Sequence, residues 1–492
     1  MVNLHTLTGD TYRFTFSLDV ERTTYPYHHI MSELDRISFG TDGWRDHRSA
    51  FTDTRVRAVA SAFADHLHEL DVGTDRVAIG YDARRDSPDI ARTIAETITA
   101  YGFDVWLASR DCPTPAIASV IDEFDLVGGV MVTASHNPPA YNGIKLIPYG
   151  GAPALPELTD AIEANLGRET EPEGYPSGST TSFDFVEHHV ETVLSRVDTA
   201  LHDLTVAYDA MYGSGRGVTD TALERAGATV RRLRCDRKED FGGDAPEPDE
   251  HRLETLIEVV TSGEADLGIA NDGDADRVAI VTPSGFVNAH LLFALMYEDL
   301  LKDASGPAVR TVSTTFLIDR IAEAHHEQVI ETAVGFKWVA AAMAQHDALI
   351  GGEESGGFTV RGHVREKDGP LAALLLADAH HRRSIDERVD DLLDQYGQIF
   401  QVTESVDCPD EEKATVLHDL NEQQPTQLAG RSVEAINDTD GLKFLLEDGS
   451  WVLIRPSGTE PKLRVYAEAA SESSLRALID AATSILDKIR DS

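Results

Sequence analysis

The feature that most constrains the fold of this chain is an internal repeat, in which one order of strands, helices and loops occurs three times. In the first copy an apolar strand at 76–81 precedes a helix at 87–101, a strand at 103–107 and a further apolar strand at 126–132 that runs into a polar loop. The elements of the other two copies are expected at 204–208, 217–226, 229–233 and 266–270, and at 311–315, 317–325, 328–332 and 348–351. Strands that alternate with helices predict mixed α/β layers with largely parallel strands.

The sequence after residue 397 has a different pattern, with strands expected at 398–406, 442–446, 451–455 and 463–469 and a final helix at 471–489. The predicted fold class is therefore α/β, with three similar mixed α/β domains followed by a C-terminal α+β domain. The expected divisions are an N-terminal extension at 1–35, domain I at 36–180, domain II at 181–286, domain III at 287–392 and domain IV at 393–492. The extension is polar and aperiodic, and is interpreted as disordered sequence or as the product of an upstream start codon that is not used.

The chain carries 43 Lys and Arg against 85 Asp and Glu, a formal net charge of −42. This surplus of negative charge argues against a protein that binds nucleic acid or anionic membranes, and fits the acidic surface of a halophilic protein. The sequence has neither an apolar stretch long enough to span a bilayer nor the pattern of a signal peptide, so a cytoplasmic protein is expected. Cys112, Cys235 and Cys408 are far apart and are expected to be reduced thiols.

Asp272, Asp274 and Asp276 stand at alternate positions directly after the apolar run 267–270. Three carboxylates this close repel one another unless a cation lies between them, and oxygen ligands favour a hard divalent cation such as Mg²⁺. A solvated acidic turn is the alternative. An EF-hand is excluded, because Arg277 stands where that loop needs Gly and the residues that follow it are typical of a strand. The segment therefore predicts a metal loop between two buried strands.

Ser135 lies in a second polar loop, Thr133-Ala134-Ser135-His136-Asn137-Pro138, at the end of the strand at 126–132. A lone serine in a turn is most often a cap or a turn former. Here His136 and Lys145 stand nearby, and both can contact a phosphate group. The Gly-x-Ser-x-Gly pattern of an α/β-hydrolase is missing. Because ligands bind outside the carboxyl ends of strands in such sheets, the loops of the three copies are each expected to be functional.

Two further loops offer groups that suit a sugar phosphate. Residues 455–462, with Arg464 beyond them, combine a guanidinium, two hydroxyls and glycine N–H groups, as in a phosphate cradle, although an ordinary hairpin turn is the alternative. Glu353 and Ser355 lie in a Gly-rich loop and suit vicinal sugar hydroxyls, with a surface turn as the alternative. Positive charge follows this second loop at His363, Arg365 and Lys367.

Taken in order, these loops resemble the motifs of a known family. The motifs are Phe39-Gly40-Thr41-Asp42-Gly43-Trp44-Arg45, Thr-Ala-Ser-His-Asn-Pro at 133–138, Asp-Gly-Asp-x-Asp-Arg at 272–277, Gly-Glu-x-Ser-Gly at 352–356 and Arg-x-Ser-Gly-Thr at 455–459. From about Ile37 to its C-terminus the chain resembles the α-D-phosphohexomutase superfamily, of the phosphoglucomutase/phosphomannomutase type. The resemblance implies four domains around a central cleft.

The resemblance also implies a reaction. Ser135 would be phosphorylated in the resting enzyme, and its phosphoryl group would bind one Mg²⁺ per chain together with Asp272, Asp274 and Asp276. The phosphoryl group would pass to the free hydroxyl of a hexose monophosphate. The product of that step, a hexose 1,6-bisphosphate, would turn around and return its other phosphoryl group to the serine, and would also serve as the activator.

Two sets of site residues follow from the resemblance. The catalytic residues are Ser135, His136, Arg45, Lys145 and Arg277, and the general base is left open among the last four. The substrate-binding residues are Gly335, Lys337, Glu353, Ser355, His363, Lys367, Arg455, Ser457, Gly458, Thr459 and Arg464. The implied partners are small sugar phosphates, with neither nucleic acid nor membrane, and the chain is expected to act as a monomer or homodimer.

Within the superfamily three segments look like the phosphoglucomutase branch, so glucose 1-phosphate and glucose 6-phosphate are the expected substrates. Glu353-Glu354-Ser355, the segment 363–369 and Val334-Gly335-Phe336-Lys337-Trp338 carry this similarity. Gly357 stands where phosphomannomutase and phosphoglucosamine mutase relatives usually have His, and those two activities are the alternatives. Two rivals from other classes are a phosphoserine-dependent phosphohydrolase and an inactive sugar-phosphate sensor.

Overall fold

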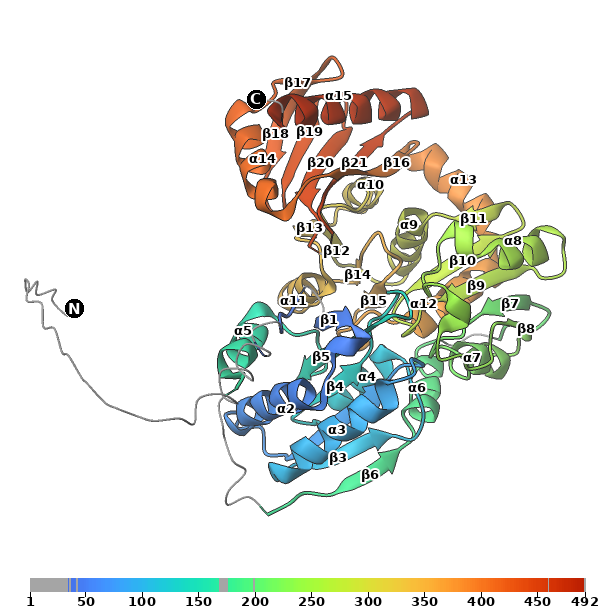
Figure 1. Cartoon of the computed structure of the whole chain (residues 1–492). Helices are drawn as coiled ribbons and strands as arrows, with labels where there is room; N and C mark the ends of the chain where they lie inside the picture. Colours follow the sequence, from blue (N-terminus) through green and yellow to red (C-terminus); the bar gives the residue numbers. More distant parts are fainter. Residues whose placement is uncertain are drawn as a thin grey trace, which may run out of the picture.

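The computed structural model describes residues 34, 37–40, 43–167, 176–197, 200–458 and 460–490. Apart from residue 34, the extension expected at 1–35 lies outside the described residues, and so does Thr459. The described chain forms four β-sheets in chain order, with helices packed against them (Figure 1). Domain I to domain IV denote the parts of the chain built on these sheets, and the expected boundaries between them stay predictions. The predicted fold class is confirmed.

The first three sheets share one run of strands, which confirms the internal repeat. The runs are β3-β2-β4-β5, β8-β7-β9-β10 and β13-β12-β14-β15. In each run the first three strands are parallel and the fourth is antiparallel to its neighbour. The repeated order of elements in the sequence therefore corresponds to a repeated topology.

Domain I surrounds its sheet with helices on both faces. Its strands, in spatial order, are β1 (Trp44–His47), β5 (Tyr141–Pro148), β4 (Gly128–Val132), β2 (Arg76–Tyr81), β3 (Asp104–Ala108) and β6 (Thr180–Phe183). Its helices are α2 (Asp53–His68), α3 (Ser87–Ala100), α4 (Thr114–Glu123) and α5 (Pro156–Asn165), and α6 (Phe185–Leu194) packs on α4. Because both faces are covered, β4 is buried at every residue and its sequence is apolar throughout.

Domains II and III are smaller versions of the same arrangement. The strands of domain II are β11 (Gly285–Val287), β10 (Val278–Thr282), β9 (Leu267–Asn271), β7 (Thr205–Asp209) and β8 (Thr229–Leu233), with helices α7 (Thr219–Arg225) and α8 (Glu254–Thr261). Those of domain III are β13 (Val329–Thr332), β12 (Ala308–Thr311), β14 (Ile350–Gly352) and β15 (Phe358–Val360), with helices α9 (Ala289–Leu300), α10 (Leu317–Ala324), α11 (Phe336–His346), α12 (Gly369–Arg382) and α13 (Ile385–Tyr396).

One predicted strand of domain III is displaced. The sequence predicts a strand at 311–315, whereas β12 ends at Thr311. The hydroxyls that follow bond locally instead: Thr311 Oγ1 lies 2.8 Å from Thr314 Oγ1, and Leu317 N–H donates to Thr315 Oγ1 at 2.9 Å. Short hydroxyl side chains compete with a ladder in this way, so the segment turns into α10.

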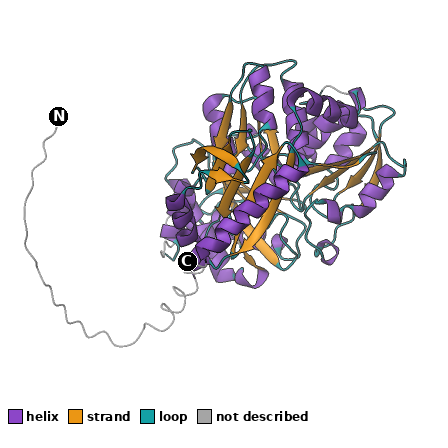
Figure 2. Ribbon diagram, turned by 90° about the horizontal axis from the view of Figure 1, so that it is seen from above, coloured by secondary structure: helices purple, strands orange, loops and turns teal. Residues whose placement is uncertain are grey.

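Domain IV is an antiparallel sheet covered by helices. Its strands, in spatial order, are β16 (Phe400–Asp407), β21 (Lys462–Ala469), β20 (Trp451–Pro456), β19 (Leu442–Leu446), β18 (Arg431–Asn437) and β17 (Gln427–Leu428), and its helices are α14 (Asp410–Gln423) and α15 (Glu472–Arg490). The view from above shows α15 lying across the strands (Figure 2). Its apolar side chains, among them Leu478 and Leu486, are buried there.

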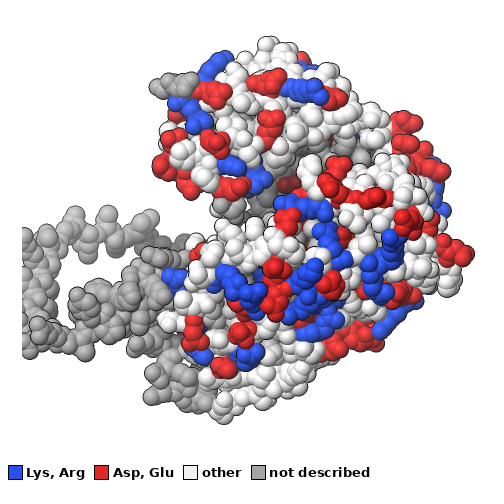
Figure 3. Space-filling model, turned by 45° about the vertical axis from the view of Figure 1, so that its right-hand side comes forward, with Lys and Arg blue, Asp and Glu red and all other residues white. Residues whose placement is uncertain are grey.

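The hydrophobic cores show how the domains are joined. One core contains residues of both domain II and domain III, such as Ile269 and Phe293, and another joins Ile117 of domain I to Val218 and Leu371. Domain IV has a core of its own within residues 408–489. Figure 3 shows a deep indentation between domain IV, at the top, and the rest of the molecule. In the described part of the chain, no helix is long and apolar enough to cross a membrane.

Candidate active site

The three loops predicted to carry the chemistry occupy the same position in their sheets. Each connects the third and fourth strands of the repeated run: β4 and β5 flank Ser135, β9 and β10 flank the three aspartates, and β14 and β15 flank Glu353. Each contains a residue with left-handed backbone, Ser135 (φ 50°), Ala275 (φ 54°) and Gly356 (φ 86°). For a residue other than glycine this conformation costs about 1–2 kcal/mol, so other contacts must hold Ser135 in place.

The turns of the three domains are in direct contact. Ser135 Oγ donates a hydrogen bond to Asp272 Oδ2 at 2.9 Å. The carbonyl of Ser135 lies so close to Gly273 that a Cβ there would be 2.6 Å from it. The N–H of Val278 donates to the carbonyl of Gly356 at 3.0 Å, which joins the second turn to the third. The structure thus brings Ser135 and the aspartate loop, which the sequence places in different domains, into one site.

Arg84 holds the Ser135 turn in its strained conformation. Its side chain is 2% exposed and its guanidinium is paired with Asp82 at 2.9 Å. It donates to four carbonyls of the turn, those of Ser135 and Asn137 at 2.7 Å, Pro138 at 2.9 Å and Tyr141 at 3.0 Å. Sequence reasoning missed both Arg84 and Asp82. A signal existed, because they directly follow β2, at the carboxyl end where ligand-binding residues are expected.

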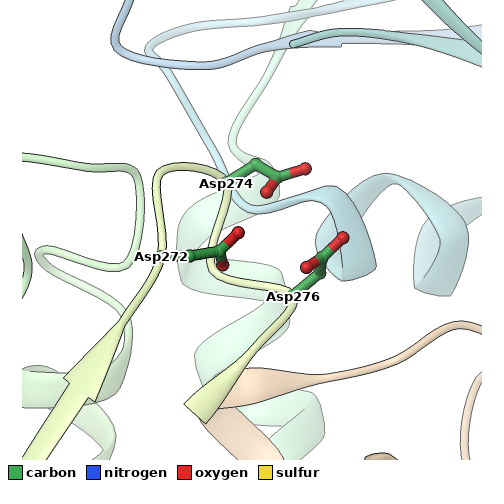
Figure 4. Close-up of side chains that lie close together, drawn as sticks. All are labelled: Asp272, Asp274 and Asp276. Atoms are coloured by element: carbon green, nitrogen blue, oxygen red, sulfur yellow. The ribbon is translucent and has the colours of Figure 1, made fainter. Parts of the chain in front are cut away.

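The three aspartates converge as the sequence predicts. All are fully buried, and one carboxylate oxygen of each lies within 4.8 Å of the others. Their carboxylates point into the same space beside the start of α4 (Figure 4), where Thr114 Oγ1 donates to Asp274 at 2.6 Å. Oδ1 of Asp274 and of Asp276 is shielded from solvent, and no described residue donates a hydrogen bond to either atom. Buried oxygen acceptors without donors fit a hard cation such as Mg²⁺.

The carboxylates differ in their affinity for a proton. Burial, together with repulsion from Asp276 and Asp274, raises the pKa of Asp272 well above its ordinary value. Burial also opposes ionisation of Asp274, but Lys145 at 3.0 Å and the hydroxyl of Thr114 lower the pKa of that carboxyl below its ordinary value. Asp272 is thus the carboxylate that most readily holds a proton, and a bound cation would favour its ionised form.

Three predicted cations surround the aspartates: Lys145 and Arg277 of the catalytic set and Lys367 of the substrate-binding set. Lys145 Nζ and Lys367 Nζ each lie 3.1 Å from Asp276 Oδ2. The guanidinium of Arg277 lies with its Nε 3.9 Å from Asp276 Oδ1, and the backbone N–H of Arg277 donates to Asp272 Oδ1 at 3.2 Å. These contacts place positive charge where a phosphoryl group on Ser135 would carry negative charge.

His136 and Arg45 lie on the Ser135 side of the site. His136 Nδ1 is 3.3 Å from Ser135 Oγ, and Arg45 Nη1 donates to Asn137 Oδ1 at 3.4 Å. Burial and the guanidiniums of Arg277 and Arg45 lower the pKa of His136 well below its ordinary value, so the ring is neutral. All four predicted candidates for the base therefore lie around the Ser135 and aspartate turns.

Glu353 and Ser355 form the third turn. Burial raises the pKa of Glu353 to about 7, although Lys367 opposes this. Glu353 Oε1 accepts from the N–H of Gly335 at 3.1 Å, which links it to the segment that leads into α11 and the buried Lys337. Ser355 Oγ is shielded from solvent and has no hydrogen-bond partner among the described residues. A hydroxyl in that situation suits a ligand that supplies the partner.

The predicted phosphate loop lies between β20 and β21 of domain IV. Arg455 and Arg464 stand directly opposite each other in the ladder, paired with Asp440 at 3.0 Å and with Glu460 at 2.9 Å. A Cβ at Gly458 would meet no atom of the described residues within 4 Å, so these residues leave the loop open there. Lys413 of α14, which sequence reasoning missed, supports the loop by donating to the carbonyls of Ser457 and Glu460 at 2.7 and 2.6 Å.

His363 is placed apart from these groups. Its Nε2 lies 2.6 Å from Asp368 Oδ2, and His189 of α6 approaches the same oxygen at 3.0 Å. Asp368 caps α12 by accepting from the N–H of Leu371 at 2.9 Å. The polar contact that the described structure gives His363 is therefore with a helix cap and not with the three turns. Its predicted part in substrate binding stays a prediction.

Comparison with known proteins agrees with this architecture. The sequence models for the four domains of phosphoglucomutase/phosphomannomutase match residues 36–173 (alpha/beta/alpha domain I), 184–285 (alpha/beta/alpha domain II), 288–396 (alpha/beta/alpha domain III) and 405–484 (C-terminal domain). The chain therefore belongs to the phosphoglucomutase/phosphomannomutase family, within the α-D-phosphohexomutase superfamily. It is a phosphohexomutase, an intramolecular phosphotransferase.

Individual relatives span nearly the whole chain. A probable phosphoglucosamine mutase of Methanothermobacter thermautotrophicus is 32% identical over 463 residues, 93% of this chain and 100% of the relative. A phosphoglucomutase/phosphomannomutase of Thermococcus kodakarensis is 29% identical over 458 residues, 92% of this chain and 98% of the relative. A crystal structure of a protein from Thermus thermophilus, named as a phosphomannomutase, is 30% identical in sequence and has a TM-score of 0.80. The match covers 92% of this chain and 99% of that chain.

Proposed function

We propose that this phosphohexomutase interconverts glucose 1-phosphate and glucose 6-phosphate through a phosphoserine at Ser135 and a bound glucose 1,6-bisphosphate. The observation that carries the proposal is the hydrogen bond of 2.9 Å between Ser135 Oγ and Asp272, inside a buried three-carboxylate loop. This hydroxyl bonds to a buried carboxylate of another domain, which a turn-forming serine does not require. The position suits a serine that carries a phosphoryl group, because a cation held by the aspartates would offset the negative charge of that group.

In the first half-reaction the bond between phosphorus and Ser135 Oγ breaks as a bond forms to the free hydroxyl of the sugar phosphate. That hydroxyl gives up its proton to a base. The neutral ring of His136, 3.3 Å from Ser135 Oγ, is in reach of this exchange. Lys145, Lys367 and Arg277 stabilise the charge of the phosphoryl group in transit. Ser135 Oγ takes up a proton as phosphorus leaves it. In the second half-reaction the Ser135 hydroxyl gives up that proton as the other phosphoryl group transfers to Oγ, and the sugar oxygen that loses this group takes up a proton.

Asp272, Asp274 and Asp276, with the phosphoryl group on Ser135, would hold one Mg²⁺. When bound, this ion offsets the charge of the aspartates and withdraws electrons from phosphorus. Arg455, Ser457, Gly458 and Arg464 would grip the phosphate that is not reacting, in both orientations of the bisphosphate. Glu353 and Ser355 would bind the sugar hydroxyls, because a buried acceptor and a hydroxyl without a partner suit vicinal hydroxyls.

The choice of glucose is supported by the loop Glu353-Glu354-Ser355 and by Gly357, where the mannose- and glucosamine-specific relatives usually have His. The second candidate substrate is glucosamine phosphate, which is favoured by the name of the Methanothermobacter relative. A glucosamine carries a cationic amine where glucose has a hydroxyl, so it asks for an additional buried acceptor. Glu354 is occupied by a hydrogen bond of 3.0 Å from Thr311 Oγ1, which supports glucose.

The test is a coupled assay with glucose 1-phosphate, glucosamine 1-phosphate and mannose 1-phosphate at matched concentrations, with glucose 1,6-bisphosphate and Mg²⁺ present. The proposal expects the largest kcat/KM for glucose 1-phosphate. A larger value for glucosamine 1-phosphate would overturn the substrate assignment while leaving the phosphohexomutase reaction intact.

The same assay separates the rival functions. Release of inorganic phosphate in step with substrate loss would indicate a phosphohydrolase, and binding of sugar phosphate without turnover would indicate a sensor. The role of the bisphosphate as activator, a cytoplasmic location, adaptation to high salt and a monomeric or homodimeric state stay predictions.

A further inference from the structure

Asp440 lies where domain IV meets domain III, in the turn between β18 and β19. Its Oδ2 accepts from Arg455 Nε at 3.1 Å and lies 3.0 Å from Arg455 Nη2. The same oxygen accepts from the backbone N–H of Val334 at 3.0 Å. Arg455 belongs to the phosphate loop of domain IV, whereas Val334 belongs to domain III. A single carboxylate oxygen therefore joins the two domains.

Arg455 needs an anion at this position. It faces Arg464 across the β20–β21 ladder, and like charges directly opposite each other destabilise a sheet. Asp440 balances one guanidinium and Glu460 balances the other. A phosphate group would take the same donors, so in the free protein the Asp440 carboxylate stands in for the ligand.

The turn that carries Asp440 has little freedom to move by itself. Gly441 has φ 84°, and a Cβ there would lie 2.3 Å from the Ile454 carbonyl and 2.7 Å from Arg455 Cβ. At the start of the turn, Asn437 donates to Glu331 of domain III, which also accepts from Lys443 Nζ at 2.7 Å. Asp440 is thus fixed to Arg455 on one side and to domain III on the other.

The contact with Val334 leads to the sugar-binding turn. The next backbone N–H, that of Gly335, donates to Glu353 Oε1 at 3.1 Å. Consecutive N–H groups of one short segment therefore bind Asp440 and Glu353. The peptide planes that carry these two N–H groups are rigid and share the Cα of Val334. If the segment shifts toward Asp440, the N–H of Gly335 that binds Glu353 is therefore reoriented as well.

We propose that Asp440 is a positioning residue that couples phosphate binding at Arg455 to the sugar-binding turn at Glu353. In the free protein Asp440 holds both Arg455 and the N–H of Val334. When a phosphate group takes Arg455, Asp440 retains the N–H of Val334, and the segment to Gly335 adjusts with it. This inference rests on the proposed reaction, in which the phosphate loop must release and regain a phosphate as the bisphosphate turns around.

Two variants separate the two contacts. Asp440→Asn removes the charge that competes for Arg455 but keeps an oxygen that can accept from Val334. Asp440→Ala removes both. The matched control is Asp438→Asn, which makes the same change of charge at an exposed residue of the same turn.

The measurements are kcat and KM for glucose 1-phosphate and the inhibition constant of inorganic phosphate against it, all at fixed ionic strength. For Asp440→Asn we expect phosphate to inhibit roughly tenfold more tightly, the order of one charge-assisted hydrogen bond, with kcat within about threefold of wild type. For Asp440→Ala we expect the same tighter inhibition together with a further loss of about tenfold in kcat. Asp438→Asn should match wild type in both constants.

Equal inhibition constants for wild type, Asp440→Asn and Asp438→Asn would overturn the inference, and so would equal kcat values for the Asn and Ala variants. If the Ala variant does not fold, Asp440→Ser, which also loses the carboxylate, replaces it in the comparison of kcat with Asp440→Asn. Failure of the proposed function is a different result, because wild type would then show no mutase turnover with glucose 1-phosphate.

Discussion

Domains I to III and domain IV are joined in different ways. The first three share hydrophobic cores, so Ile269 of domain II and Phe293 of domain III belong to one cluster. Domain IV meets domain III through a small cluster around Trp451 and through polar contacts such as that of Lys443 with Glu331. Large shared apolar cores resist relative motion, whereas a small and partly polar interface is the kind across which domains move. The turns proposed to perform phosphoryl transfer therefore lie in one rigid body, and the predicted phosphate loop lies on a part that can adjust.

The largest expected effect comes from removing the proposed phosphoryl carrier of the rigid body, Ser135. Ser135→Ala should lower mutase kcat by about 10,000-fold or more, because Ser135 Oγ is the proposed carrier of the phosphoryl group. Stability should change little, since only a hydroxyl is lost. The coupled assay and a thermal unfolding curve check both statements. Full activity in this variant would contradict the mechanism.

Removal of the metal should have the next largest effect. Treatment with a chelator should lower activity by at least about 100-fold, and added Mg²⁺ should restore it, because Asp272, Asp274 and Asp276 would otherwise repel the phosphoryl group. Phosphate binding to domain IV should persist in the chelated protein, which isothermal titration with inorganic phosphate can measure. Activity that is indifferent to the chelator would remove the metal from the proposal.

A substitution in domain IV should act mainly on the binding of the sugar phosphate. Arg455→Gln should raise KM for glucose 1-phosphate by roughly 10- to 100-fold with a smaller fall in kcat, since one bidentate phosphate contact is lost. Arg431→Gln is the matched control, because Arg431 is also in domain IV but pairs with Asp448. A fall in kcat alone would place Arg455 in the chemistry and not in the phosphate grip.

The smallest expected effect concerns the interface itself. Burial, and then Arg310, lower the pKa of Lys443 from 10.5 to about 8, although Glu331 opposes this. The folded protein therefore releases this proton more easily than the unfolded chain does, and folding gains stability as the pH rises from about 8 toward 10.5. Relative to Lys443→Met, wild type should gain up to about 2–3 kcal/mol of unfolding free energy across that window.

Chemical denaturation at a series of pH values measures this difference. Lys488→Met, at an exposed position of α15, is the control and should show no such trend. A difference between wild type and Lys443→Met that stays constant with pH would show that the lysine titrates alike in the folded and unfolded states.

The sequence predicted the larger part of the fold, because its signals are local. Apolar runs, helix periodicity and the glycine-bearing loops repeat at matching positions, and the parallel sheets follow from that alternation. The strand expected at 311–315 was displaced because hydroxyls of Thr311 and Thr314 bond to each other. That competition depends on local geometry which an apolar pattern does not report.

The sequence by itself determined the order of the motifs: the serine loop at 133–138, the aspartate loop at 272–277 and the basic loop at 455–459 together resemble the α-D-phosphohexomutase superfamily, and that resemblance implies phosphoryl transfer. Each loop taken alone left an ordinary turn as the alternative. Only the tertiary structure decided what holds them. Arg84 fixes the Ser135 turn, and Asp440 joins Arg455 to Val334, through contacts between residues far apart in the chain. An arginine or aspartate in a loop is ordinary in such an acidic sequence. Its role depends on which distant carbonyl or guanidinium the fold places within hydrogen-bonding distance.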